Sequence, residues 1–190
     1  MILFLPFLQM KSGHHQAAEA LAAKIKERYP QESVEKIDIL NYTFPRLERV
    51  VTATYLKWIH YSPASYHHFF EKQFHRQQYV FKPFEPFEKK MLQTLYALIL
   101  VKKPQYIICT HSFPSRLVGL LKRQYGLTVP LINVYTDFFV DSVWEKQLAD
   151  LHMVPSTECA VELMQDYGVQ IPPNFSIWYS SASTYCKNNS

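Results

Sequence analysis

Glycine is scarce in this sequence, with four residues among 190. The glycine-rich signatures G-x-G-x-x-G and G-x-x-x-x-G-K-[ST] are absent, which argues against a dinucleotide-dependent enzyme and a P-loop ATPase. The G-x-S-x-G turn of many hydrolases is missing as well. We therefore expect each glycine to mark a turn, and any active site to be built without these loops.

The sequence also contains few cysteines and no long apolar run. The three cysteines, Cys109, Cys159 and Cys186, have no C-x-x-C spacing, and no secretion signal precedes them. We therefore expect reduced thiols in a cytoplasmic protein. No apolar run approaches the roughly 18 residues of a membrane-spanning helix, so we expect no such span. Neither H-E-x-x-H nor a paired Cys/His spacing is present, and we expect no metal site.

The net charge of +4 is too small on its own to indicate a nucleic-acid partner, but the charge is unevenly distributed. Residues 41–103 contain ten Lys and Arg against four Asp and Glu, together with 14 aromatic residues. Three interpretations are open for the aromatic side chains of this segment: they belong to the hydrophobic core, they bind nucleic acid, or they face anionic lipid. No nucleic-acid-binding module accompanies them, so we favour lipid over nucleic acid. The residues expected to face the membrane are Lys57, Trp58, Lys72, Arg76 and Lys82.

Short apolar runs alternate with helical patterns along the chain, which is typical of a parallel sheet with helices on both faces. The sequence predicts strands over Ile2–Leu8, Val34–Leu40, Tyr106–Thr110, Leu131–Tyr135 and Leu151–Val154. It predicts helices over 16–29, 84–101, 114–125 and 156–167, and one or two aromatic-rich helices within 45–82. The fold class is therefore α/β.

Polar residues follow three of the predicted strands. Ser12-Gly13-His14 follow the first strand, Thr110-His111-Ser112 close the third, and Thr136-Asp137 close the fourth. Ligands of parallel α/β sheets bind at the carboxyl ends of the strands. We therefore expect these three groups to converge on one crevice.

Several roles are open to these residues from their types alone. His14 stands where a helix begins, so it can act as a base, bind an anion, or serve in capping and packing. His111 is either a hydrogen-bonded loop residue or a ligand-binding one. Asp137 either caps a following helix or orients a histidine.

These motifs resemble the N-terminal domain of the monogalactosyldiacylglycerol synthase and diacylglycerol glucosyltransferase family, a group of processive glycolipid glycosyltransferases. The resemblance covers residues 1–173. It is carried by Ser12-Gly13-His14 with the following Gln16–Leu21, by Thr110–Pro114, and by Val134–Phe138 with Trp144.

The resemblance implies a GT-B architecture, in which two Rossmann-like domains face each other across a cleft. Residues 1–173 match the N-terminal, acceptor-side domain, which takes diacylglycerol and touches the inner face of the cell membrane. A UDP-sugar would bind a C-terminal domain. His14 matches the family's candidate for the catalytic base, with Ser12, Gly13, His111, Ser112, Thr136 and Asp137 lining the cleft. The implied reaction is inverting transfer of a hexose to the acceptor hydroxyl.

The sequence departs from the family pattern in three places. Lys11 stands where the family loop G-x-G-H has its first glycine, and Asp141 stands where a histidine commonly follows the T-D-F motif. Residues 174–190 form an irregular tail in place of the passage into a donor domain. We therefore expect a truncated or frame-shifted copy, to which a separate donor domain would have to be supplied.

Two alternatives to that function remain open at this stage. The chain can be a catalytically inactive module that binds lipid or a full-length relative. It can also belong to another GT-B enzyme, such as one acting on a lipid-linked peptidoglycan precursor. The loop of such an enzyme would be richer in glycine than Lys11-Ser12-Gly13.

Overall fold

The computed structural model of the chain describes residues 1–8, 12–65, 68 and 85–169, and its centre is a parallel sheet. The five strands lie in the order β2-β1-β3-β4-β5, and each neighbouring pair is parallel. They are β1 (Ile2–Leu5), β2 (Val34–Lys36), β3 (Tyr106–Cys109), β4 (Leu131–Val134) and β5 (Leu151–Met153). Because the strand order changes direction between β1 and β3, the carboxyl ends of these two strands form the switch point at which such sheets bind ligands.

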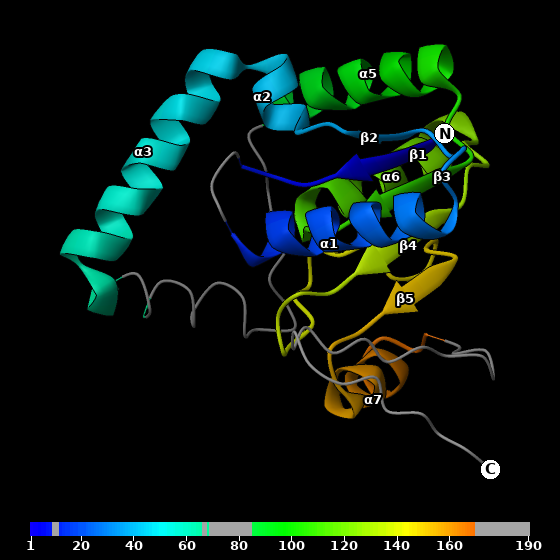
Figure 1. The fold of residues 1–190 in the computed structure, drawn as a ribbon. Helices are drawn as coiled ribbons and strands as arrows, with labels where there is room; N and C mark the ends of the chain where they lie inside the picture. The colour runs from blue at the N-terminus through cyan, green and yellow to red at the C-terminus, as the bar shows by residue number, and fades with distance from the viewer. Residues whose placement is uncertain (9–11, 66–67, 69–84, 170–190) are drawn as a thin grey trace.

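Helices cover both faces of the sheet, which confirms the Rossmann-like α/β fold (Figure 1). Helix α1 packs on one face, while α5 and α6 pack on the other. The described helices are α1 (Gly13–Arg28), α2 (Ile39–Thr43), α3 (Pro45–Tyr61), α5 (Glu85–Lys102), α6 (Ser112–Tyr125) and α7 (Thr157–Gln165).

Alternating side chains of the strands divide the core into two parts. In β1, Leu3 and Leu5 join the cluster that includes α5 and α6, while Phe4 joins the cluster with α1. All three side chains are fully buried. Successive residues of a strand point to opposite faces, so an apolar run without alternation identifies a strand buried on both sides. This explains why the sequence predicts the central strands β1 and β3.

The second strand is shorter than the sequence predicts. Instead of continuing to Leu40, it ends at Lys36, and α2 begins at Ile39. Asp38 causes this change, because its Oδ1 accepts hydrogen bonds from the backbone N–H groups of Leu40 and Asn41. The aspartate is therefore a helix N-cap inside an otherwise apolar run.

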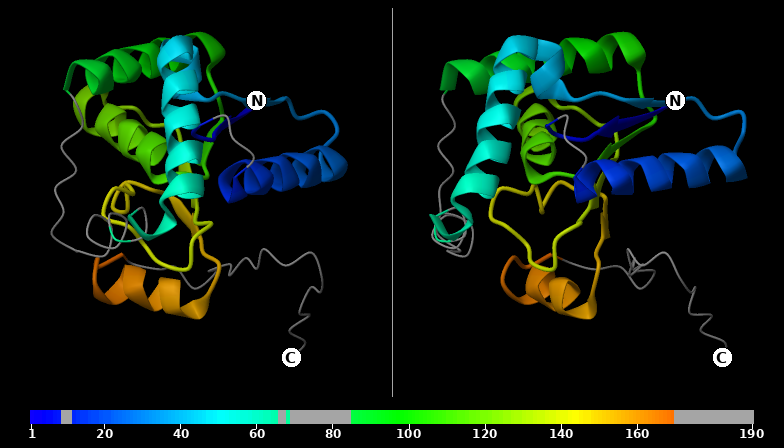
Figure 2. Two further views of the ribbon diagram at one scale, coloured as in Figure 1. Left: turned by 90° about the vertical axis from the view of Figure 1, so that its left-hand side faces the viewer. Right: turned by 60° about the vertical axis from the view of Figure 1, so that its left-hand side comes forward.

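The described part of the basic, aromatic segment includes two long helices with different environments. Helix α5 is a core helix, with Leu95 fully buried. Helix α3 extends away from the sheet beyond the carboxyl ends of its strands, and Glu48 is its one buried residue (Figures 1 and 2). Within the described residues, no helix combines the length and the apolar character needed to cross a bilayer.

Glycine has a conformational role at the end of α6, where Gly126 adopts the left-handed φ of 65°. A side chain in this region costs about 1–2 kcal/mol. We predict that Gly126→Ala lowers the free energy of unfolding by about that amount, measured by chemical denaturation. Gly13→Ala is the matched control, because Gly13 has no positive φ and a Cβ there meets no atom within 4 Å. Equal losses in the two variants would contradict this explanation.

Candidate functional site

His14 lies in the first turn of α1 and joins the ends of two strands. Its Nδ1 is 2.8 Å from the carbonyl oxygen of Thr110, which follows β3, and 2.7 Å from Oγ1 of Thr136, which follows β4. A carbonyl oxygen can only accept, so Nδ1 must carry the proton. The other ring nitrogen, Nε2, then holds a lone pair and can accept a proton from a ligand. His14 therefore has the tautomer that a general base needs.

His111 packs against His14 at the N-terminus of α6. The two ring centroids are 4.7 Å apart with an edge-to-face angle of 62°. Nδ1 of His111 accepts the backbone N–H of Phe113 at 3.1 Å, so this histidine caps α6. Burial lowers the pKa of His111 well below its ordinary value, and charges on His14 and His15 lower it further. Two imidazolium rings at this distance would repel each other by about 3–4 kcal/mol at an effective dielectric constant near 20.

The structure brings together the residues that follow β1, β3 and β4, as the sequence predicts. The sequence does not predict which residue after β4 forms a hydrogen bond with His14. Thr136 makes that hydrogen bond, not Asp137. No helix follows β4 before β5, so Asp137 is not a helix cap. Ser112 is buried, and its hydroxyl donates a hydrogen bond to the Asp141 carboxyl group. Ser112 therefore connects α6 to the β4–β5 loop.

Ser12 and Gly13 form the entry to α1. Ser12 has extended backbone angles and occupies the N-cap position, but its side chain makes no capping hydrogen bond. Gly13 is exposed and is the first helical residue, so its role is not to provide a left-handed turn. The space beside its Cα is open, which allows a ligand to approach the backbone closely.

Buried polar atoms without a hydrogen-bond partner are concentrated around this edge of the sheet. In the described part of the chain, six of the seven such atoms belong to residues shortly after β1, β2 or β3. Buried polar groups are normally satisfied by protein, ordered water or ligand. These atoms therefore provide hydrogen-bonding capacity for a polar molecule. They are Ser12 Oγ, His15 Nε2, Asp38 Oδ2, Thr43 Oγ1, Thr110 Oγ1 and Arg116 Nε.

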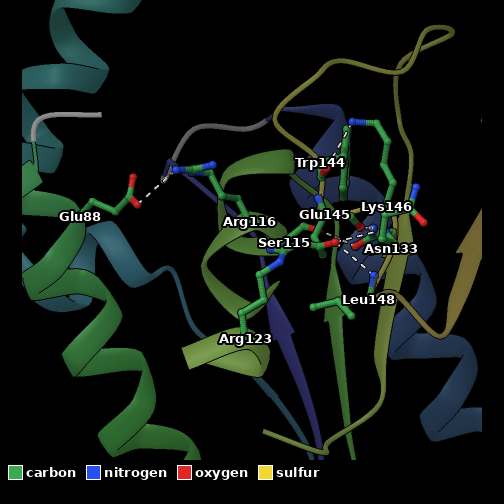
Figure 3. A network of polar contacts seen from close by, with 10 residues as sticks. Glu88, Ser115, Arg116, Arg123, Asn133, Trp144, Glu145, Lys146 and Leu148 are labelled. Atoms are coloured by element: carbon green, nitrogen blue, oxygen red, sulfur yellow. Dashed lines mark hydrogen bonds and ion pairs between the residues drawn. The ribbon is translucent and has the colours of Figure 1, made fainter. Parts of the chain in front are cut away.

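The β4–β5 loop carries Thr136 and is held by Glu145 (Figure 3). The Glu145 backbone N–H donates to Ser115 Oγ at 3.1 Å, and its carbonyl oxygen accepts from Asn133 Nδ2 at 2.6 Å. Ser115 Oγ in turn donates a hydrogen bond to Asn133 Oδ1 at 2.8 Å, so the three residues are bonded to one another. The Glu145 carboxylate pairs with Arg123 at 2.5 Å and accepts the N–H groups of Gln147 and Leu148. A loop without helix or strand is thus fixed against α6.

Two further ionisable groups of the same loop are buried. Burial raises the pKa of Asp141, although its carboxyl group accepts hydrogen bonds from Val143 N–H and from Ser112. Burial lowers the pKa of Lys146 to about 8, and its Nζ lies 4.1 Å from the centre of the Tyr167 ring. Asp141, which stands where the resemblance leads us to expect a histidine, therefore takes part in the internal packing of the loop.

The residues expected to face a membrane are only partly described. Lys57 and Trp58 lie on α3, where Lys57 is exposed and Trp58 Nε1 donates to Ser65 Oγ at 2.8 Å. Lys72, Arg76 and Lys82 lie outside the described residues, as do Lys11, Cys186 and the tail 174–190. Cys109 and Cys159 are free, buried thiols. The described residues contain no cluster of His, Cys, Asp and Glu suited to a metal ion.

The strand order and the helices on both faces of the sheet define a Rossmann-like α/β domain. The family model for monogalactosyldiacylglycerol (MGDG) synthase matches residues 14–172, and the chain belongs to this family. The match begins at His14 and includes the ends of β3 and β4, whereas β1, Ser12 and Gly13 precede it.

Curated relatives are similar over most of the chain. This chain is 37% identical over 166 residues to the uncharacterized glycosyltransferase YkoN of Bacillus subtilis (strain 168), and the match covers 87% of this chain and 43% of the relative. It is 30% identical over 164 residues to the processive diacylglycerol beta-glucosyltransferase of Bacillus cereus (strain B4264), covering 83% and 39%. The protein of the same name from Bacillus cytotoxicus is 26% identical to this chain, and the match covers 93% of this chain and 46% of that relative.

The chain spans less than half the length of these relatives and matches their N-terminal part. No solved structure is significantly similar to it.

Gly119 of α6 provides the space for the Glu145 carboxylate, because a Cβ at Gly119 would lie 2.2 Å from Glu145 Oε2. We predict that Gly119→Ala lowers the free energy of unfolding by about 1–3 kcal/mol through overpacking. In a Glu145→Ala background the same substitution should cost much less, because the clashing side chain is gone. Chemical denaturation of the four proteins in this double-mutant cycle measures the difference. Equal costs in both backgrounds would show that the two residues do not compete for this space.

Proposed function

We propose that this chain is the acceptor-side domain of a glycosyltransferase that transfers a hexose from a UDP-sugar to diacylglycerol. The observation that carries the proposal is the hydrogen bond between His14 Nδ1 and the Thr110 carbonyl oxygen, because it leaves Nε2 of His14 as the proton acceptor. Family membership and relatives named as diacylglycerol glucosyltransferases support the substrate class.

In the proposed reaction, Nε2 of His14 removes the proton from the acceptor hydroxyl. The resulting oxygen nucleophile attacks the anomeric carbon of the sugar, the bond to UDP breaks, and the configuration at that carbon is inverted. Thr136 and the Thr110 carbonyl hold the His14 ring in place during proton transfer. Ser12, Gly13, His111, Ser112 and Asp137 surround this centre as positioning or cleft residues. We propose that the UDP-sugar binds a separate C-terminal domain.

The proposed lipid surface is α3 and the basic segment that follows it. Several large apolar side chains of α3 are exposed, and Lys57 lies among them. Apolar side chains beside basic residues suit the interface of an anionic membrane. This arrangement supports a peripheral position on the inner face of the cell membrane. The exposed apolar residues of α3 are Val50, Val51, Leu56 and Tyr61.

The catalytic assignment predicts a large activity loss for His14→Ala. We would mix the chain with the separately expressed C-terminal half of the Bacillus cereus relative, UDP-glucose and vesicles containing diacylglycerol, and measure glucolipid formation. His14→Ala should lower the rate on the order of 100-fold or more, because general-base catalysis contributes about that much. Lys26→Ala, at an exposed position of α1 and not on the proposed lipid surface, is the control and should retain activity.

Retained activity in His14→Ala would refute the base assignment. Vesicle binding without turnover by the unsubstituted chain would instead fit a catalytically inactive binding module.

The membrane assignment predicts that Lys57→Glu weakens binding to anionic vesicles about tenfold. Each basic residue near such a surface contributes about 1 kcal/mol, and the new carboxylate adds repulsion. Cosedimentation with phosphatidylglycerol vesicles at low and high salt measures the effect, and binding of the unsubstituted chain should fall as salt rises. Lys24→Glu on α1 makes the same charge change on an exposed residue away from α3. Equal loss in both variants would indicate a nonspecific response to net charge.

A further inference from the structure

His111 has two structural connections besides its contact with His14. Its ring centroid lies 5.0 Å from the Phe7 ring, and Phe7 lies 5.0 Å from Phe113. The His111 ring is therefore held between Phe7, just after β1, and His14, at the start of α1. The capping bond to the Phe113 N–H fixes the ring from a third direction.

The hydrogen-bond partners of the two histidines require different tautomers. The Phe113 N–H can only donate, so Nδ1 of His111 must hold a lone pair, and the neutral ring carries its proton on Nε2. The Thr110 carbonyl can only accept, so Nδ1 of His14 must carry the proton. If His111 were protonated at Nδ1, this new N–H group would point at the Phe113 N–H, two donors would face each other, and the hydrogen bond that caps α6 would be lost. His14 has no such obstacle at Nε2.

We infer that His111 is a positioning residue for His14: the pair is locked in opposite tautomers, and His111 stays uncharged and holds the ring of His14 while His14 alone takes up the acceptor proton. The catalytic part of this inference rests on the proposed function, whereas the tautomer part concerns the chain by itself. The ionisable groups that act on His111 electrostatically are His14 and His15, both from α1. Burial of His111 lowers its pKa in the direction that keeps it neutral.

Long-range proton–nitrogen NMR correlations of the ¹⁵N-labelled chain test the tautomers directly, because they distinguish protonated from unprotonated ring nitrogens. We expect a protonated Nε2 for His111 and a protonated Nδ1 for neutral His14. Over the pH range in which His14 takes up its second proton, the pattern of His111 should not change. The same tautomer in both rings, or an imidazolium pattern at His111 in that range, would overturn the inference.

Two variants separate positioning of His14 from capping of α6. His111→Asn keeps a good capping acceptor but removes the ring, whereas His111→Phe keeps a ring but removes the acceptor. We expect His111→Asn to keep the cap of α6 and to lose the single-tautomer signature of His14. In the reconstituted assay its kcat should fall on the order of tenfold, with KM nearly unchanged, because a base that is poorly oriented slows the chemical step.

We expect His111→Phe to melt at a lower temperature and to keep more of the His14 signature than His111→Asn does. If His111 acts only as a cap, His111→Asn will leave the His14 signals and kcat unchanged, which would refute the positioning role. If the reconstituted protein forms no glucolipid at all, the proposed function fails, while the NMR patterns still decide whether the two tautomers are locked.

Discussion

The parallel pairing of β1 with β3 is the constraint on which the candidate site depends. Its register places Leu5 beside Cys109, so the chain leaves both strands at the same edge of the sheet. Thr110 then lies next to the start of α1, and His14 reaches its carbonyl oxygen across 96 residues of sequence. Slippage of this register would separate the two groups, because each residue of a strand advances it by about 3.3 Å. The buried apolar side chains of the central strands therefore determine the geometry of a polar site.

A second, weaker constraint fixes the residue that completes the His14 contacts. Thr136 belongs to a loop without regular structure, and an exposed loop of this kind would leave the position of its side chain variable. Glu145 limits that freedom, because its backbone and its carboxylate both bond to neighbours on α6, β4 and the loop itself. Gly119 is a consequence of this packing, since the carboxylate occupies the space of a Cβ. The loop is thus organised by hydrogen bonds where the sheet is organised by apolar burial.

The sequence predicts the parts of the fold that depend on local patterns. Unbroken apolar runs identify the central strands β1 and β3, and Gly126 identifies the end of α6 through a conformation that other residues rarely adopt. The same approach extends β2 too far, because the capping function of Asp38 depends on two backbone N–H groups beyond it. The start of α1 is also misplaced, since Gly13 lies within the helix. The error at β2 therefore occurs where a single side chain ends one element and begins another.

The site shows the same division between local and nonlocal information. Strand-end residues can be predicted to converge, because the carboxyl ends of parallel strands share an edge. The choice of Thr136 over Asp137 cannot be predicted, because it depends on how the β4–β5 loop folds onto α6. The sequence also does not predict that His111 caps α6, because Ser, Thr, Asp and Asn are the residues usually found at a helix N-cap.

Helix α3 lies beyond the same carboxyl edge at which His14 is found (Figures 1 and 2). A lipid surface that contacts α3 would therefore lie on the side of the sheet where the proposed base takes its proton. The sheet topology thus places the proposed lipid contact and the proposed base at the same edge of the sheet.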